Sequence, residues 1–463
     1  MINSDYIKSI LQDLVYDLEK TFPYASALVL ETAGERILVQ TRQQSAEMLD
    51  PSRGAVLTVF NGRSFLESAT GDLSPEGLRE AAGRLQELGR DQGIFYDGPA
   101  IDPGPKMDEY YLVKPQKHPE TVALTEKIQA CTALKDDLHG RDEKVVQAVA
   151  QYAHVRTREL FINRHKVLYQ DLRRTQMIAQ VIMREGERSV NLHTGQALQG
   201  GYEQAFIPED KLARLTEDCR RLLTARRLSP GFYPCLFSPE FAGIFAHEAF
   251  GHGTETDMFL KKRAKGEEYI GKPVASPLVD MFDSPALPGQ AASFFFDHEG
   301  QLAQETRIIE KGILKRGITD LNSATRLGLA RSANGRRESF ERKVYARMTN
   351  TYFGPGTDTF ESLLASLDDG FFLDHPSNGM EDPKGWGIQL EGYYAERIKK
   401  GRLTGEVFTP VIITGYVPDL LLSISGVGDR VEISGLGMCG KGHKEWVKVT
   451  DGGPFLKLRA RLA

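Results

Sequence analysis

Apolar residues in the first part of the chain recur with two different periods. Between residues 5 and 20 they recur every three or four positions, which predicts an amphipathic helix with Ser4 as its N-cap. Four short runs rich in apolar and β-branched residues follow, at 27–31, 36–40, 55–60 and 64–68. They are separated by Ala33–Gly34, Pro51 and Asn61–Gly62, which are typical of turns. This pattern predicts an antiparallel meander with a hairpin at Asn61–Gly62.

The chain then alternates between helical and strand-like segments. A second helix is expected from Ser74, because Pro75 occupies the favoured first position and the apolar residues share one face. A stretch rich in Pro and Gly from 100 to 118 predicts a connection, and 119–152 is expected to be helical. Strand-like runs lie at 160–164, 166–170 and 177–183. A further helix is expected at 208–225.

The character of the sequence changes near residue 228. Beyond it, glycine recurs every few residues and short apolar runs dominate, which indicates a β-rich domain with turns at Gly, Pro and Asp. The most apolar segment, 411–425, is too interrupted to span a bilayer, so we interpret it as buried strands. The sequence therefore predicts an α+β protein with two domains. Residues 1–228 are expected to form an N-terminal domain of antiparallel sheet and helices, with a sub-boundary near 100–118. Residues 229–463 are expected to form a β-rich domain that carries a metal-binding helix.

Composition and charge argue against several classes of protein. The 463 residues exceed what one compact core usually needs, and 41% hydrophobic and 26% charged residues are ordinary for a globular protein. A net charge of −5 disfavours nucleic acid and anionic membranes as main partners. The N-terminus lacks the pattern of a secretory signal, and the four cysteines include no C-x-x-C pair. We therefore expect a cytoplasmic protein that binds neither a membrane nor nucleic acid directly.

The strongest chemical signal is the motif H-E-x-x-x-H formed by His247, Glu248 and His252. Imidazole rings are common zinc ligands, and a glutamate beside them is placed to accept a proton from a metal-activated water. Ser238 and Pro239 lie just upstream and are typical of a helix start. The sequence thus predicts a zinc centre on a helix, with Glu248 as general base. Two incidental histidines on a helix are the alternative interpretation.

The spacing of the two histidines constrains the local backbone. On a regular α-helix, five positions rotate by about 500°, which places the second ring about 140° from the first, too far round to share a metal ion. Glycine permits a helix to widen into a π-turn or to end abruptly, and Gly251 and Gly253 flank His252. We therefore predict a distortion of the helix at His252.

A catalytic zinc usually has three protein ligands, so one ligand must come from elsewhere in the chain. The candidates are Glu255, Asp257, His298 and Cys439. Spacing alone does not choose among them. Cys439 lies among glycines that permit close backbone approach, and the neighbouring Lys441 is expected to favour its thiolate. A small buried hydrophobic cysteine is the alternative interpretation.

Several motifs in the second half resemble the TldD branch of the TldD/PmbA (TldE) family of zinc metallopeptidases, formerly labelled modulators of DNA gyrase. They occur in the order of the family, at 247–257, 293–300, 347–352 and 437–441. The resemblance implies that His247, His252 and Cys439 bind Zn²⁺ and that Glu248 is the general base.

The resemblance also implies partners and a type of substrate. Members of the family form intracellular dimers, either as homodimers or as heterodimers of a TldD subunit with a PmbA/TldE-type subunit. They hydrolyse unfolded or extended peptides, and leader-peptide removal is one of their roles. In this sequence Phe250 and Thr256 depart from the residues that are usual in the family.

Two further residues are candidates for substrate binding. Arg347 and Asn350 carry donors that suit a peptide backbone or a developing oxyanion, although structural pairing explains them equally well. Together, these observations predict a zinc-dependent peptidase that hydrolyses extended peptides with metal-activated water and a glutamate base. The alternative is a non-catalytic peptide-binding or regulatory subunit of a TldD/PmbA-type complex.

Overall fold

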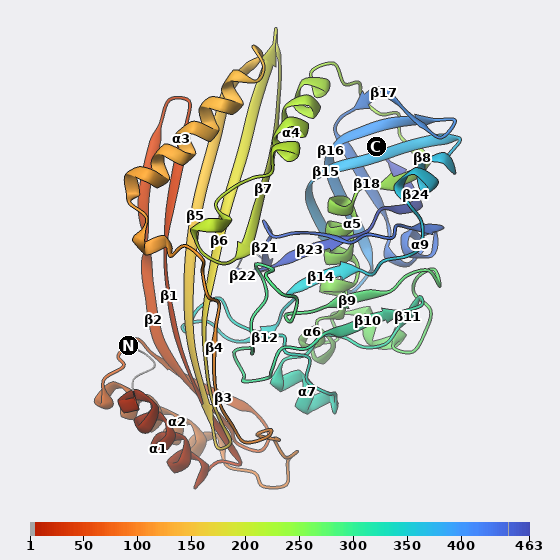
Figure 1. The fold of residues 1–463 in the computed structure, drawn as a ribbon. Coiled ribbons are helices and arrows are strands. Elements are labelled where there is room, and N and C mark those ends of the chain that lie inside the picture. Colours follow the sequence, from red (N-terminus) through yellow and green to blue (C-terminus); the bar gives the residue numbers. More distant parts are fainter. Residues whose placement is uncertain (1–4, 443) are drawn as a thin grey trace.

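A layer of long, curved strands forms one side of the molecule, and the C-terminal half of the chain packs beside it (Figure 1). The computed structural model describes residues 5–442 and 444–463. The predicted N-cap Ser4 therefore lies outside the described residues. The predicted α+β class, with a β-rich C-terminal region, is confirmed.

The first sheet has seven strands, in the order β3-β2-β1-β5-β6-β4, with β7 also paired to β6. Its strands are β1 (Tyr24–Gln40), β2 (Gln44–Phe60), β3 (Phe65–Thr70), β4 (Met107–Leu112), β5 (Val145–Asn163), β6 (Lys166–Glu185) and β7 (Arg188–Gln199). Neighbouring strands are antiparallel, except that β4 runs parallel to β6. The predicted meander is thus confirmed as β1, β2 and β3.

The strands of this sheet are longer than the sequence indicates. The predicted break at Ala33–Gly34 is wrong, because β1 continues through it with a bulge between Thr32 and Gly34. The predicted break at Pro51 is also wrong, because β2 continues through this residue. Proline is tolerated there because β3 pairs with β2 only from Ala55 onward, so Pro51 needs no hydrogen-bond partner on that side. The hairpin at Asn61 is confirmed, and its side chain accepts hydrogen bonds from two backbone N–H groups of the turn.

Two other predictions for this half are wrong. The expected helical block at 119–152 contains α3 (Leu124–Gly140), but β5 begins within it at Val145. Because β5 is paired on both sides, with β1 and β6, the sheet overrides its local helical pattern. The expected connection at 100–118 contains β4, which pairs with residues 166–171 of β6.

Four helices pack against the first sheet: α1 (Asp5–Glu19), α2 (Pro75–Gln92), α3 and α4 (Glu209–Leu222). Helices α1 and α2 lie together at one end of the strands, whereas α4 lies between β7 and the C-terminal half (Figure 1). Ser74 caps α2 as predicted, because its hydroxyl accepts a hydrogen bond from the N–H of Gly77. Short 3₁₀ turns lie at Pro119–Thr121, Tyr202–Gln204 and Lys265–Tyr269.

The C-terminal half contains two larger sheets and two short strand pairs. One sheet has the order β15-β8-β24-β18-β16-β17, with β19 paired to β24 and β15 paired to β16. Its strands are β8 (Gly231–Phe237), β15 (Asp369–Glu381), β16 (Gly387–Lys399), β17 (Arg402–Phe408), β18 (Val411–Tyr416), β19 (Gly426–Val427) and β24 (Leu456–Leu462).

The other large sheet has the order β11-β10-β9-β14-β23-β20. Its strands are β9 (Met281–Asp283), β10 (Thr306–Glu310), β11 (Ile313–Leu314), β14 (Asn350–Phe353), β20 (Glu432–Ser434) and β23 (Thr450–Gly453). The short pairs are β12 (Gly335–Arg336) with β13 (Tyr345–Ala346), and β21 (Met438–Lys441) with β22 (Lys444–Lys448). The helices of this half are α5 (Pro239–Ala246), α6 (Thr256–Leu260), α7 (Leu321–Leu327), α8 (Phe360–Ala365) and α9 (Val417–Leu422). Helix α5 packs between the two large sheets, with contacts to both β15 and β23.

The prediction of buried strands for 411–425 is only half right. Residues 411–416 form β18, but the chain then turns into α9. Pro418 occupies the first turn of α9, where its fixed φ and missing N–H favour a helix start. None of the helices in 5–442 and 444–463 is long and apolar enough to cross a membrane.

The predicted division between residues 228 and 229 falls between the strands of the first sheet and those of the other sheets. Side chains from both segments nevertheless share one buried cluster, in which Tyr394 and Val407 pack with residues of α3, α4, β5 and β6. The division into two domains therefore stays a prediction.

Helix α4 packs its apolar face against β6 and β7. Substitutions on this helix test that packing. Leu215 is buried there, whereas Glu217 on the same helix is exposed. We expect Leu215→Ala to lower the free energy of unfolding by about 2–5 kcal/mol, because it leaves a cavity. The control Glu217→Ala is expected to change it by about 0.5 kcal/mol or less. Thermal unfolding of both variants checks this, and equal melting temperatures would contradict the packing.

Candidate metal centre

Helix α5 positions the first half of the histidine motif. Ser238 caps the helix by accepting a hydrogen bond of 3.2 Å from the N–H of Phe241, and Pro239 occupies the first turn. The aromatic side chains of Phe241 and Phe245 are fully buried between the two large sheets. The predicted helix start is thus confirmed. Because its aromatic side chains are fixed in the core, α5 also has a fixed direction, which sets the position of His247.

The predicted distortion of the helix is confirmed. Residues His247–Gly251 form a π-helical turn, which is followed by a 3₁₀ turn at His252–Thr254. The N–H of His252 donates to the carbonyl of His247, five residues back instead of four. The wider turn brings the two imidazoles to one side, with ring centroids 5.1 Å apart and planes nearly perpendicular.

Glycine enables this turn for a different reason from the predicted one. Gly251 has φ −67°, an ordinary helical value, so its conformational freedom is not used. A Cβ at this position would lie 2.1 Å from the sulfur of Met348, which is fully buried. At Gly253 the nearest atom to such a Cβ is 3.6 Å away. Gly251 therefore provides space for close packing rather than a special backbone angle.

Three side chains with metal-ligand atoms meet beside this turn. The ligand atoms of His247, His252 and Cys439 all lie within 4.8 Å of one another, and His252 Nε2 is 3.3 Å from Cys439 Sγ. Ligand atoms around a tetrahedral zinc, with bonds of about 2.0–2.3 Å, are separated by roughly 3.5 Å. Two nitrogens and one sulfur are also a donor set that zinc prefers. The residues present therefore fit a zinc ion.

The charges of these three groups depend on one another. Burial alone would raise the pKa of the Cys439 thiol, but the neighbouring imidazoles lower it to about 4. Burial opposes protonation of His247, yet the negative charge of Cys439 raises its pKa to about 9. The pKa of His252 is raised as well, against the effect of burial, by Cys439 and Glu255. The protein thus stabilises the thiolate, which is the form that binds metal.

Arg347 holds Cys439 rather than a substrate. Its side chain is 1% exposed, and Nη2 donates to the sulfur of Cys439 at 3.0 Å and to the carbonyl of Cys439 at 2.9 Å. Nη1 donates to the carbonyl of Glu445, and Nε donates to Glu255 Oε1 at 3.1 Å. Arg347 does not line the cavity in front of the histidines. The structure therefore favours the structural pairing that the sequence left open for this residue.

Asn350 is likewise committed to internal partners. Its amide donates to the carbonyl of Ser284 and to the hydroxyl of Ser293, and its carbonyl accepts from Thr450. The side chain is fully buried and does not line the cavity. The structure brings neither Asn350 nor Arg347 to the place where a substrate would bind.

Glu255, a candidate ligand, lies behind His252 instead of beside the other ligand atoms. Its Oε2 is 3.3 Å from His252 Nδ1, which leaves Nε2 directed at Cys439. Carboxylates commonly orient metal-binding histidines in this way. Although Glu255 is buried, Lys441, His252 and Arg347 keep the pKa of its carboxyl well below the usual range.

The other sequence candidates are used elsewhere. Asp257 accepts from Lys441 at 2.6 Å and from Lys261 at 3.0 Å. Lys441 pairs with Asp257 and Glu255, whereas Arg347 contacts the sulfur, so the expected effect of Lys441 on the thiolate stays a prediction. His298 accepts from the backbone of Arg337 and belongs to a turn outside the cavity.

The ligand atoms open onto a cavity of about 730 Å³. Glu248 lines it next to His247, and a Cβ at Gly379 would lie 2.5 Å from the Cγ of Glu248. The glycine of β15 therefore makes room for the Glu248 side chain. Apolar side chains form much of the remaining wall, namely Ile244, Met258, Met380, Met438 and Trp446.

Two acidic residues of this cavity escaped prediction from the sequence. Burial raises the pKa of Glu381 to about 9, and neither of its carboxylate oxygens has a hydrogen-bond partner among the described residues. Asp451 of β23 places Oδ2 4.0 Å from His247 Nδ1. Both residues reach the site from strands far along the chain, and neither lies in a recognisable motif.

A histidine–glutamate–histidine segment and a thiolate meet at one cavity, and donor sets of this kind hold the metal ion in metal-dependent hydrolases. Residues 230–459 match the family model described as the PmbA/TldA metallopeptidase C-terminal domain. The chain belongs to the TldD/PmbA family of metallopeptidases, as its motifs predict.

Relatives and solved structures agree with this assignment. A protein named metalloprotease from Methanocaldococcus jannaschii is 31% identical over 326 residues, which cover 70% of this chain and 71% of the relative. A zinc metalloprotease TldD homolog from Saccharolobus solfataricus is 28% identical over 319 residues, covering 67% of this chain and 70% of the relative. The crystal structure of TldE from Thermococcus kodakarensis has the same fold, with a TM-score of 0.78, 16% identity, and coverage of 98% of this chain and 100% of that chain.

The close packing of Gly251 gives a test of the π-turn. We expect Gly251→Ala to lower the free energy of unfolding by about 1–3 kcal/mol, because the new methyl group overlaps the sulfur of Met348. The same variant is expected to lose bound zinc. Gly253→Ala is the matched control, since its methyl group meets no atom closer than 3.6 Å. Thermal unfolding and metal analysis of both variants check this, and equal effects would contradict the packing.

The ionisation of Cys439 gives a second test. In metal-free protein at neutral pH we expect one thiolate among the four cysteines, and it should disappear only as the pH falls through about 4. Burial raises the pKa of Cys131 to about 11 and those of Cys219 and Cys235 to about 12, so these thiols stay protonated. Ultraviolet absorbance of the thiolate measures this. A thiolate signal that persists in Cys439→Ala would contradict the assignment.

Proposed function

We propose that the protein is a zinc-dependent peptidase that hydrolyses extended peptides. The observation that carries this proposal is the meeting of His247, His252 and Cys439 at one wall of a cavity, with the carboxylate of Glu248 beside them. The zinc metalloprotease name of one relative supports the choice of metal. In this proposal His247, His252 and Cys439 hold the ion.

A bound zinc ion supplies Lewis acidity, which polarises a carbonyl and lowers the pKa of a water molecule. Glu248 follows His247 directly on the π-turn and faces the cavity, so its carboxylate is positioned to take the proton of the attacking water. The same carboxyl group then returns the proton to the nitrogen of the leaving amine. Glu255 orients the imidazole of His252, and Arg347 orients the sulfur of Cys439.

The shape of the cavity supports a peptide in extended form. Residues 377–381 of β15 and 438–441 of β21 line it, and its apolar side chains suit exposed hydrophobic residues of an unfolded chain. Unfolded proteins and leader peptides are substrates of this kind. A homodimer, or a heterodimer with a PmbA/TldE-type subunit, and a cytoplasmic location are further parts of the proposal, and they rest on the family resemblance.

The role of Glu248 is tested by removing its charge while keeping its shape. We expect Glu248→Gln to retain stoichiometric zinc and to lower kcat for an unstructured peptide by about 10²–10⁴-fold, because the amide does not accept a proton. His252→Ala is expected to lose zinc and activity together. Metal analysis beside a peptide-degradation assay measures both variants.

Three results would count against the proposal. Unchanged turnover in Glu248→Gln would refute the general-base mechanism. Native protein without stoichiometric zinc and without peptide hydrolysis would favour the non-catalytic peptide-binding subunit. Cleavage of small amides but not of unstructured peptides would instead identify a hydrolase of another substrate class.

A further inference from the structure

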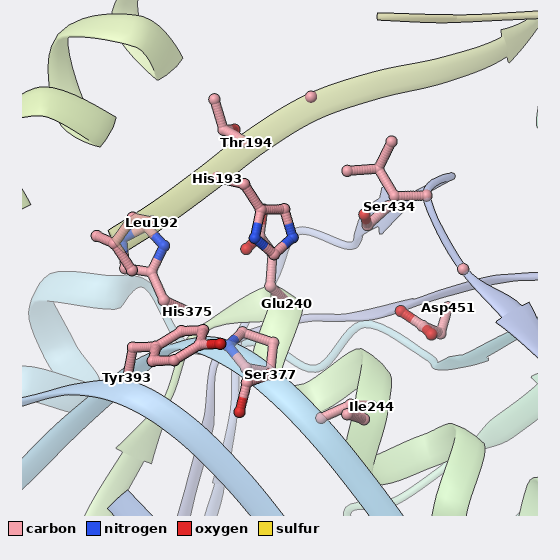
Figure 2. A pocket seen from close by; sticks show the side chains of 14 residues that line it. Leu192, His193, Thr194, Glu240, Ile244, His375, Ser377, Tyr393, Ser434 and Asp451 are labelled. Carbon is pink, nitrogen blue, oxygen red and sulfur yellow. The ribbon is translucent and has the colours of Figure 1, made fainter. Parts of the chain in front are cut away.

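A second, smaller cavity adjoins the metal cavity. We call it the Glu240 cavity; its volume is about 240 Å³, and it lies between β7 of the first sheet and the C-terminal half (Figure 2). Four residues line both cavities, namely Ile244, Ser377, Gly437 and Asp451. The Glu240 cavity is therefore adjacent to the space in which the proposed substrate would lie.

The polar side chains of this cavity have few partners. Figure 2 shows His193 projecting from β7, with Glu240 on α5 and His375 on β15 also lining the cavity. Within 5–442 and 444–463, the side chains of Glu240 and His193 form no hydrogen bond or salt bridge, whereas His375 donates to or accepts from Asp218 at 3.0 Å. Unpartnered polar groups beside a binding cavity are available to a ligand.

The charge of the cavity is negative. Glu240 and Asp451 contribute carboxylates, and no lysine or arginine lines the cavity among the described residues. Lys448 lies near Asp451 but outside the lining, which leaves Glu240 without a compensating cation.

We propose that the Glu240 cavity is a subsite of the peptidase that binds a cationic group of the peptide, with Glu240 as the residue that determines this specificity. The inference rests on the proposed function. The volume of the cavity is below the range of about 300–1,000 Å³ that is usual for whole small molecules, so it suits one side chain or one chain terminus.

Helix α5 sets the distance between recognition and chemistry. Glu240 and His247 are seven residues apart, which corresponds to about 10 Å along a helix with a rise of 1.5 Å per residue. A long lysine or arginine side chain near the scissile bond spans much of this distance. A terminal ammonium two or three residues away also reaches it, because an extended chain advances about 3.3–3.6 Å per residue.

Equilibrium binding to zinc-loaded full-length Glu248→Gln protein tests the subsite without turnover. The probes are short unstructured alanine–leucine peptides, blocked at both ends, that carry one lysine or, at the same position, one norleucine. We expect the lysine peptide at its best position to bind about tenfold more tightly, because norleucine has the same length without the ammonium group. Lysine-free peptides with a free or an acetylated N-terminus distinguish a terminal ammonium from a side chain.

Two further substitutions, each added to Glu248→Gln, identify the residue responsible. Glu240→Gln is expected to reduce the preference to near unity. Glu361→Gln is the matched control: it removes the same charge from the same helix position, the second residue of α8, where the side chain is exposed and outside both cavities. The control is expected to keep the tenfold preference.

The outcomes separate this inference from the proposed function. Absence of any ammonium preference, or a preference that Glu240→Gln leaves intact, would overturn the subsite. Native protein that binds lysine peptides selectively but does not hydrolyse them would retain the subsite and refute the peptidase. Hydrolysis with no preference for a cation would retain the peptidase and refute the subsite.

Discussion

The backbone hydrogen bond from His252 to His247 is the constraint on which the site depends. It closes a π-turn at the end of α5, so that histidines five residues apart present their rings to one point. A regular α-helical bond would turn the second ring away from the first. The π-turn also requires glycine at position 251, because the buried side chain of Met348 already fills the space that a Cβ would occupy. The chemistry of the site and the packing of the core are thus linked at one position.

A network of buried charges holds the side chains that the π-turn brings together. Arg347 connects Cys439, Glu255 and the backbone of Glu445, and Glu255 in turn contacts His252 and Lys441. Each buried charge in this group has an opposite charge or a hydrogen bond, which offsets the cost of removing it from water. The network fixes both the direction of an imidazole and the position of a sulfur. Arg347 acts on the metal centre without lining the cavity, whereas Glu255 and Lys441 also form part of its wall.

Local features of this site could be predicted from the sequence, and features that depend on tertiary contacts could not. The helix start at Ser238 and the distortion at His252 follow from residues next to one another in the chain. The same holds for the cap of α2 and the hairpin at Asn61. The contacts of Arg347 could not be predicted, because its partners Glu255 and Cys439 each lie 92 residues away in the sequence. The first part of β5, which begins at Val145, was missed for a related reason, since its conformation is imposed by pairing with β1 and β6.

One short helix connects the parts of the molecule that the proposals combine. Helix α5 (Pro239–Ala246) follows its cap Ser238, carries Glu240 in its first turn, where Glu240 and residues of β7 line the same cavity, and leads directly into His247. Because its aromatic residues are fully buried between two sheets, α5 is a rigid spacer whose length is fixed by the core. A negative side chain at the N-terminal end of a helix is also favoured by the helix dipole, so Glu240 stabilises the spacer while it faces the smaller cavity. The proposed recognition at one end and the proposed hydrolysis at the other are therefore held at a constant separation. A substrate of the proposed kind has to place its cationic group and its scissile bond in register with this helix.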